Sequence, residues 1–163
     1  MKHIAMSDAP KPISDDIAAM AFVQASHLCN GLSAETLDKL LTAGELLEYA
    51  PAEVVIQEGG QDQHLFVVLD GAVSVQKSTD GESVEVAVLE RSGVFGENAA
   101  LTGQARSASV VSTTDTRLVR FPGDVVRQVA EEVPKFGRLL ATLMAGRAKD
   151  TEKKLSEPPV DRS

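Results

Sequence analysis

The sequence is poor in the residues that several kinds of site require. Among its 163 residues Cys29 is the only cysteine, so no disulfide can form within the chain and a reducing compartment is expected. The histidines His3, His27 and His64 are far apart and lack the close spacing of metal ligands. We therefore expect no metal site and interpret Cys29 as a small core residue.

Long apolar runs are also missing. No stretch approaches the roughly 18 apolar residues that a membrane span needs. Charged residues such as Asp8 and Lys11 interrupt the N-terminal region, which therefore has no apolar signal core. There is no Walker loop, nucleophile elbow or zinc motif. These absences predict a cytoplasmic protein that is not an enzyme and has no membrane partner.

Positive charge is scarce. The chain has 16 lysines and arginines against 24 aspartates and glutamates, which gives a formal net charge of −8. A nucleic-acid partner needs clustered lysine and arginine, so none is expected. A small anionic ligand stays compatible with this charge, because one buried arginine can outweigh a diffuse surface field.

The two ends of the chain flank a helical segment and a β-region. Residues 1–13 carry two prolines and no apolar periodicity, which predicts a flexible lead-in. Helices are expected within residues 14–44, where Ser14 starts the first and Ser33 caps the second, which Gly44 ends. The charged stretch that ends in two prolines predicts a disordered tail over residues 156–163.

From residue 45 to residue 121 short valine-rich runs alternate with turn residues. The turns Gly59-Gly60, Asp70-Gly71 and Asp80-Gly81 favour positive backbone angles. Val84 and Val86 alternate with polar residues, as in half-buried strands. The pattern predicts an antiparallel, jelly-roll-like β-roll. Its expected strands are 45–50, 53–58, 64–69, 72–78, 82–90, 107–114 and 117–121.

The helical pattern returns over residues 122–155 and predicts two closing helices. The first runs from Gly123 to about Glu132, and Pro134 opens the second. The apolar face of the second comprises Phe136, Leu139, Leu140, Leu143 and Met144. That face can pack on the roll, close over a ligand or pair with a second copy of the chain. We thus expect a mostly β fold with flanking helices, as a single domain over residues 14–155.

The segment Phe95–Val110 interrupts the β-region and carries chemistry of its own. Gly96 permits close approach of the backbone, and residues 97–101 can form a helical turn whose first N–H groups attract an anion. Arg106 can bind two phosphate oxygens at once. Next to such an anion, Glu97 would need hydrogen bonds from a group such as a sugar hydroxyl. A phosphate beside a sugar describes a nucleotide.

This segment resembles the phosphate-binding cassette of cyclic nucleotide-binding domains, as in the catabolite activator protein and the regulatory subunits of cyclic-AMP-dependent kinase. The family pattern reads F-G-E-x-A-L, a short variable stretch, then P-R-x-A-[ST]-V, and this chain keeps its spacing. The resemblance implies that Glu97 binds the ribose 2′-hydroxyl and that Arg106 binds the cyclic phosphate. Gly96, the N–H group of Ala108 and the Ser107 hydroxyl would complete the phosphate site. The element order also matches the family, over roughly residues 28 to 145.

Other residues of the expected site are open to a second interpretation. Asn98 and Ala99, in the cassette's helical turn, are included among the ligand-binding residues, although Asn98 stands where the family usually has an apolar residue. Ala105 likewise replaces the usual proline. The residues Val75, Val86 and Leu89 either line the base pocket or belong to the plain core.

Simpler interpretations also exist for the charged residues. Glu97 and Arg106 could form an ion pair with each other, and Ser107 could be only a strand residue. Arg147 could reach the ligand base or remain solvated. The glycines and small residues of the cassette favour the ligand interpretation for Glu97 and Arg106.

The resemblance implies a cyclic nucleotide sensor that couples binding to movement of its C-terminal helices, with no catalytic or DNA-binding module. Cyclic AMP is the expected ligand and cyclic GMP the alternative, because Ser107 stands where threonine often accompanies cyclic GMP in the family. No cofactor is expected. The expected partners are an unidentified protein effector and a second copy bound through the last helix. The alternatives are a β-roll without a ligand that acts by protein contact, and a regulatory fragment of a larger transcription factor, channel or kinase subunit.

Overall fold

A computed structural model of the chain describes residues 10–156; in the last helix it describes the side chains up to Gly146 and that of Leu155. The helices are α1 (Ile17–Gln24), α2 (Ala34–Ala43), α3 (Glu97–Thr102), α4 (Gly123–Glu132) and α5 (Pro134–Ser156), with 3-10 turns η1 (Ile13–Asp15) and η2 (His27–Cys29). The strands are β1 (Lys11–Pro12), β2 (Glu45–Tyr49), β3 (Val54–Ile56), β4 (Leu65–Asp70), β5 (Val73–Thr79), β6 (Glu82–Leu89), β7 (Val94–Phe95), β8 (Ser109–Ser112) and β9 (Thr116–Phe121).

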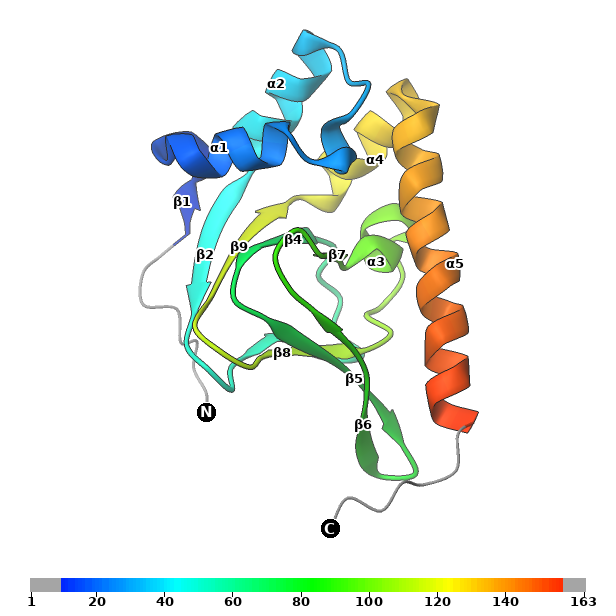
Figure 1. The fold of residues 1–163 in the computed structure, drawn as a ribbon. Coiled ribbons are helices and arrows are strands. Elements are labelled where there is room, and N and C mark those ends of the chain that lie inside the picture. The colour runs from blue at the N-terminus through cyan, green and yellow to red at the C-terminus, as the bar shows by residue number, and fades with distance from the viewer. Residues whose placement is uncertain (1–9, 157–163) are drawn as a thin grey trace.

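Within the described residues the strands form two antiparallel sheets. One has the order β1-β2-β9-β4-β7 and the other β3-β8-β5-β6. Helices α1, α2 and α4 gather at one end of this roll, and α5 runs along its side, with α3 between α5 and the strands (Figure 1). The expected fold class, an antiparallel β-roll with N-terminal helices and two C-terminal helices, is confirmed.

Strand β4 of the five-stranded sheet is buried on both faces, which explains its continuous apolar run. Leu65, Val67 and Leu69 point into a core that the helices share, which we call the helix-side core. Phe66 and Val68 point into the space between the two sheets, the roll-side core. Neighbouring strand residues face opposite sides, so a strand with both faces covered shows no polar alternation.

The N-terminal expectations need correction. The lead-in does not extend to residue 13, because Lys11 and Pro12 pair with β2 and the Ile13 side chain is fully buried. A two-residue strand is too short to show a period in the sequence. Residues 1–9 of the lead-in and 157–163 of the tail lie outside the described residues.

The helix caps were partly predicted. Ser33 caps α2 as expected, because its hydroxyl accepts the Thr36 N–H group at 3.1 Å. The first helix begins later than Ser14: Asp16 is its cap and accepts the Ala19 N–H group at 3.0 Å. Ser14 lies in the 3-10 turn that precedes it, and α1 ends at Gln24.

The apolar face of α5 faces the helix-side core. Phe136 and Leu140 are buried there, while Leu139 and Leu143 are partly buried against it. The packing role expected for this face is therefore confirmed. No helix in the described part of the chain combines the length and the apolar character needed to cross a membrane.

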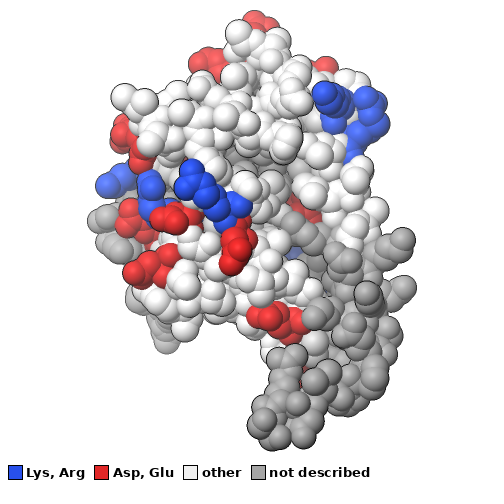
Figure 2. Space-filling model, viewed as in Figure 1, with Lys and Arg blue, Asp and Glu red and all other residues white. Residues whose placement is uncertain are grey.

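Surface charges of opposite sign lie side by side on the face seen in Figure 2. Over β2 and β9, on the left of that view, basic side chains stand next to acidic ones. Arg117 pairs with Asp16 at 2.8 Å and Arg120 with Glu45 at 2.8 Å. These partners neutralise Arg117 and Arg120.

Candidate functional site

A pocket opens between the four-stranded sheet and α3, and we call it the cassette pocket. The cassette contributes the lining residues Phe95, Gly96, Glu97, Asn98, Ala99, Arg106, Ser107, Ala108 and Val110. Its cavity volume is about 90 Å³. The sheet closes one side with apolar side chains, and the cassette provides the polar groups on the other.

The structure brings together all of the predicted site residues except one. Val75 of β5 and Val86 of β6 line the pocket, whereas Leu89 packs against the roll-side core and does not line it. Sequence reasoning missed Ile56 and Ala87, which also line the pocket. Neither lies in the cassette, and only the pairing of β3 with β8 and of β6 with β5 brings them there.

Gly96 is required by contacts inside the protein. Its φ is +84°, and a Cβ atom there would lie 2.7 Å from the His64 carbonyl oxygen and 2.9 Å from Nη1 of Arg106. Both distances are too short for a side chain, and the positive φ strains any other residue. Gly96 then leads directly into α3, the helical turn that the cassette sequence predicts.

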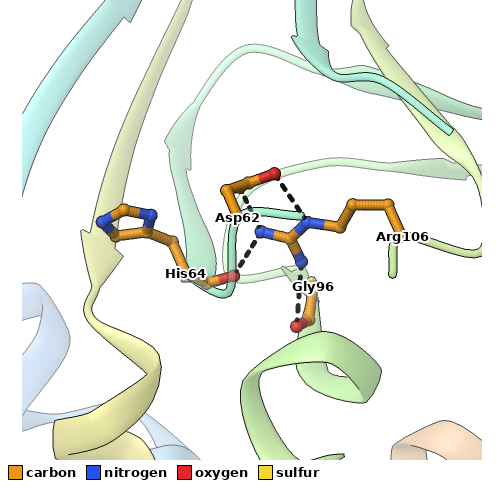
Figure 3. A network of polar contacts seen from close by, with 4 residues as sticks. All are labelled: Asp62, His64, Gly96 and Arg106. Atoms are coloured by element: carbon orange, nitrogen blue, oxygen red, sulfur yellow. Dashed lines mark hydrogen bonds and ion pairs between the residues drawn. The ribbon is translucent and has the colours of Figure 1, made fainter. Parts of the chain in front are cut away.

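Arg106 is buried and held by several acceptors, with 3% of its side chain exposed. Nε and Nη2 donate to the two Asp62 oxygens at 3.2 and 2.6 Å, Nη2 also to the His64 carbonyl at 2.8 Å, and Nη1 to the Gly96 carbonyl at 3.2 Å (Figure 3). The guanidinium carbon also lies 5.8 Å from the Phe66 ring centre. The guanidinium plane is therefore fixed at the edge of the pocket.

The Arg106 backbone is fixed as well. Its N–H group donates to the Gly60 carbonyl and its carbonyl accepts from the Gly59 N–H group, both at 2.8 Å. The predicted Gly59-Gly60 turn thus pairs with the cassette arginine. This turn and the loop after it position the main chain and the side chain of Arg106 together.

Asp62 is the polar partner that sequence reasoning missed. The expectation weighed an ion pair between Glu97 and Arg106, but the ion pair that the structure gives Arg106 is with Asp62, at 2.6 Å. Partial burial raises the pKa of Asp62, but the hydrogen bonds and charge of Arg106 outweigh it and hold this pKa below its usual value. The two residues are 44 positions apart, so no spacing rule could have connected them.

Glu97 is the buried acidic group of the pocket. It is the first residue of α3 and only 5% exposed. A carboxylate accepts hydrogen bonds from hydroxyl groups, and a buried guanidinium attracts an anion. A pocket that presents both suits a small ligand with one anionic group and one hydroxyl group near each other.

The rim of the pocket is less defined. Ser107 is exposed, and its carbonyl accepts a hydrogen bond from Nζ of Lys77 on β5. Asn98 accepts the Thr102 hydroxyl through its carbonyl oxygen at 2.7 Å, which ties the two ends of α3 together. The Arg147 side chain lies outside the described residues. In the part of the chain that is described, no group of His, Cys, Asp and Glu side chains could hold a metal ion.

The chain is similar in sequence and fold to known proteins. The family model of the cyclic nucleotide-binding domain matches residues 46–133. The cAMP-dependent protein kinase regulatory subunit of Mycosarcoma maydis is 33% identical over 125 residues, which are 75% of this chain and 22% of that protein. The catabolite activator protein structure from Thermus thermophilus is 27% identical with a TM-score of 0.66, over 78% of this chain and 61% of that one. The regulatory domain of Toxoplasma gondii PKA, crystallised with cAMP, is 26% identical with a TM-score of 0.63, over 68% of this chain and 42% of that one.

The chain spans less than two thirds of each of these relatives. The residues matched by the family model, 46–133, run from β2 to the end of α4 and contain the whole cassette and most of the β-roll. Domains of this kind are regulatory and non-catalytic, and some occur within larger enzymes. The chain belongs to the cyclic nucleotide-binding domain family.

Proposed function

We propose that this protein is a cyclic nucleotide sensor that favours cyclic AMP over cyclic GMP and converts binding into movement of α5. The observation that carries the proposal is the presence of Arg106 and Glu97, each 5% exposed, in one pocket with the positive-φ Gly96. Relatives named for cAMP support a cyclic nucleotide as the ligand, and a relative named cGMP-dependent protein kinase 2 makes cyclic GMP the alternative.

In this proposal each group of the pocket has one task. Arg106 binds the cyclic phosphate, with the Ala108 N–H group and the Ser107 hydroxyl beside it, and Glu97 accepts the ribose 2′-hydroxyl. The apolar wall that contains Val75 and Val86 receives the base. The rest of the lining, including Asn98 and Ala99, shapes the pocket around the sugar.

The coupling to α5 is proposed to run through α3. This helix packs against both α4 and α5. On α4, Nη1 of Arg127 donates to the Ala100 carbonyl at 3.0 Å and to Oε1 of Gln63 at 2.9 Å. One side chain thus joins α4 to the cassette helix and to the loop that holds Arg106. A ligand that draws α3 toward its phosphate would favour a shifted arrangement of α3, α4 and α5. The helices move if the ligand binds this shifted arrangement more tightly than it binds the arrangement of the ligand-free protein.

The closing helix is the proposed output element. We propose that an effector protein, or a second copy of the chain, reads its position. We propose that the structural unit is a single domain that ends at residue 155, as expected, but begins at Lys11 rather than at residue 14, because β1 pairs with β2.

Calorimetric titration with cyclic AMP, cyclic GMP and linear AMP tests the proposal. We expect cyclic AMP to bind tightest, ahead of cyclic GMP by about 5- to 30-fold, since one or two base contacts are worth on the order of 1–2 kcal/mol. Linear AMP should bind more weakly, because its doubly charged phosphate does not match a site with one arginine. Tighter binding of cyclic GMP would overturn the choice of base, and no binding of either cyclic nucleotide would overturn the sensor.

A β-roll without a ligand is the second candidate, and Asp62 is the observation that favours it. Its carboxylate already neutralises Arg106, so the cassette is stable with no phosphate bound. Thermal unfolding separates the two candidates. Ligand at about 100 times its dissociation constant should stabilise a sensor by roughly 2.7 kcal/mol. An unchanged melting curve at millimolar cyclic AMP and cyclic GMP would support the roll that acts by protein contact.

A further inference from the structure

A second cavity lies on the opposite side of the five-stranded sheet from the cassette pocket. It has a volume of about 560 Å³ and lies between α1, η2, the turn before β7, and α5. Its apolar walls are formed by Phe22, Leu28, Val67, Val94, Leu139 and Leu143. We call it the helix-side cavity. Among the described residues, none lines both this cavity and the cassette pocket.

The helix-side cavity and the cassette pocket are separated by the paired strands β4 and β7. Phe66 pairs with Phe95 and Val67 with Val94. Because neighbouring strand residues face opposite sides, Val67 and Val94 line the helix-side cavity while Phe95 lines the cassette pocket. The two spaces are therefore distinct sites and not parts of one groove.

One end of the helix-side cavity is polar and basic. A smaller hollow beside it shares His27, Leu28 and Leu139 with it and is also lined by Asn30, Lys135 and Phe136. No aspartate or glutamate is among the described residues that line either space. The chain as a whole has a net charge of −8, so an opening that has a lysine and no acidic residue favours a negatively charged ligand.

Lys135 is available for a ligand at this opening. It is exposed in the first turn of α5, and none of the ion pairs among the described residues involves it. Basic side chains gather at the upper right of Figure 2, where α5 begins in Figure 1. At the other end of the cavity the Arg91 guanidinium lies 4.6 Å from the Phe22 ring centre, but Arg91 does not line the space.

We propose that the helix-side cavity binds an amphiphilic anion, a carboxylate with an unbranched apolar chain. The chain lies among the apolar walls, and the carboxylate lies at Lys135, His27 and Asn30. Each additional CH₂ group that the cavity buries should raise the affinity roughly fourfold, because apolar burial is favourable. The volume of the helix-side cavity falls within the range of about 300–1,000 Å³ that is usual for small-molecule sites. The positive charge of Lys135 favours a ligand with an anionic group at that end.

Titration of the full chain with decanoate tests the proposal, with octanoate and decanol as comparisons. We expect decanoate to bind about 16-fold more tightly than octanoate, because two CH₂ groups are lost. Methyl NMR should show shifts at Val94 and Leu143 and none at Val75 and Val86. No binding at millimolar decanoate, or affinity that is independent of chain length, would overturn the proposal.

Two matched pairs of variants place the ligand. Ala25 is an exposed alanine that lines the cavity, so Ala25→Leu should weaken decanoate at least tenfold, whereas Ala141→Leu on the outside of α5 should not. Lys135→Gln should weaken decanoate by about 2- to 5-fold and leave decanol unchanged, as expected for an exposed ion pair. Arg138→Gln, also exposed on α5, is its control. Thermal unfolding of each variant verifies that it folds.

The remaining outcomes separate this site from the cassette pocket and from other occupants. Displacement of decanoate by cyclic AMP with shifts at Val75 or Val86 would place it in the cassette pocket and overturn the proposal. If a second copy covers the cavity, sedimentation will show a dimer that decanoate does not enter, and the proposal is again wrong. Decanoate binding by a chain that binds no cyclic nucleotide would uphold this site and contradict only the sensor function.

Discussion

The two sides of strands β4 and β7 differ in what they bury. Toward the four-stranded sheet, Phe66 and Phe95 stack at 4.9 Å beside the buried charged groups Arg106 and Glu97. Toward the helices the same strands present only aliphatic side chains to the helix-side core. A period of two along a strand therefore lets one pair of strands support a polar recognition pocket and an apolar cavity back to back.

This difference has consequences for how each side tolerates change. Buried charge needs partners in fixed positions, because an unsatisfied charged group in an apolar environment is costly. Apolar surface has no such directional requirement, so the helix side should respond mainly to volume. Substitutions on each side of the two strands test this contrast.

Arg106→Ala should nearly abolish cyclic nucleotide binding. Truncating a charge-assisted, desolvated phosphate contact costs roughly 2–5 kcal/mol, or about 30- to several-thousand-fold in affinity. Calorimetry measures the loss, and Arg117→Ala, which removes an arginine outside the pocket, is the control. Equal binding by wild type and Arg106→Ala would contradict the phosphate assignment.

Glu97→Gln should weaken binding less than the arginine change, on the order of 1–3 kcal/mol, because a hydroxyl then meets a neutral acceptor instead of an ionised one. The 2′-deoxy cyclic nucleotide should bind wild type weakly and lose little more in the variant. Glu131→Gln on the exposed side of α4 should change neither value. If wild type binds both nucleotides alike, the ribose assignment is wrong.

Phe66→Leu and Val67→Ala probe the two sides of one strand. Both should lower the free energy of unfolding by about 1–3 kcal/mol, since each removes buried apolar volume. Only Phe66→Leu should weaken nucleotide binding, by about 2- to 5-fold, because Arg106 loses the aromatic ring beside it. Urea unfolding and nucleotide titration separate the effects. A loss of nucleotide affinity as large in Val67→Ala would show that the two sides are not independent.

Asp62→Asn should have the smallest effect. It should lower the free energy of unfolding by up to about 1 kcal/mol at pH 7, because this carboxylate is partly exposed and its charge is screened. Its pKa is lowered in the folded chain, so its stabilising contribution is present above its unfolded pKa of about 3.9 and is lost as pH falls through the folded value. Wild type should thus lose its advantage over the variant on acidification. Urea unfolding at neutral and acidic pH measures this, and a difference independent of pH would contradict it.

Much of the fold could be predicted from local patterns. The valine-rich runs predicted the strands from β2 to β6, β8 and β9, and the turn glycines Gly59, Gly71 and Gly81 all have positive φ. Each of these signals lies within a few neighbouring residues. The very short strands β1 and β7 were missed, because two residues show no period and form only where a partner strand is already in place.

The cassette residues gathered in the pocket as the sequence indicates, because Gly96, Glu97 and Arg106 belong to one contiguous segment whose backbone is constrained by its glycines and its short helix. Only the tertiary structure decided that Asp62 pairs with Arg106 and that Leu89 does not line the pocket. It also decided that α1, η2 and α5 enclose the helix-side cavity. These features depend on which distant elements pack together. Packing is set by the sum of many weak contacts, and no single stretch of the chain carries that sum.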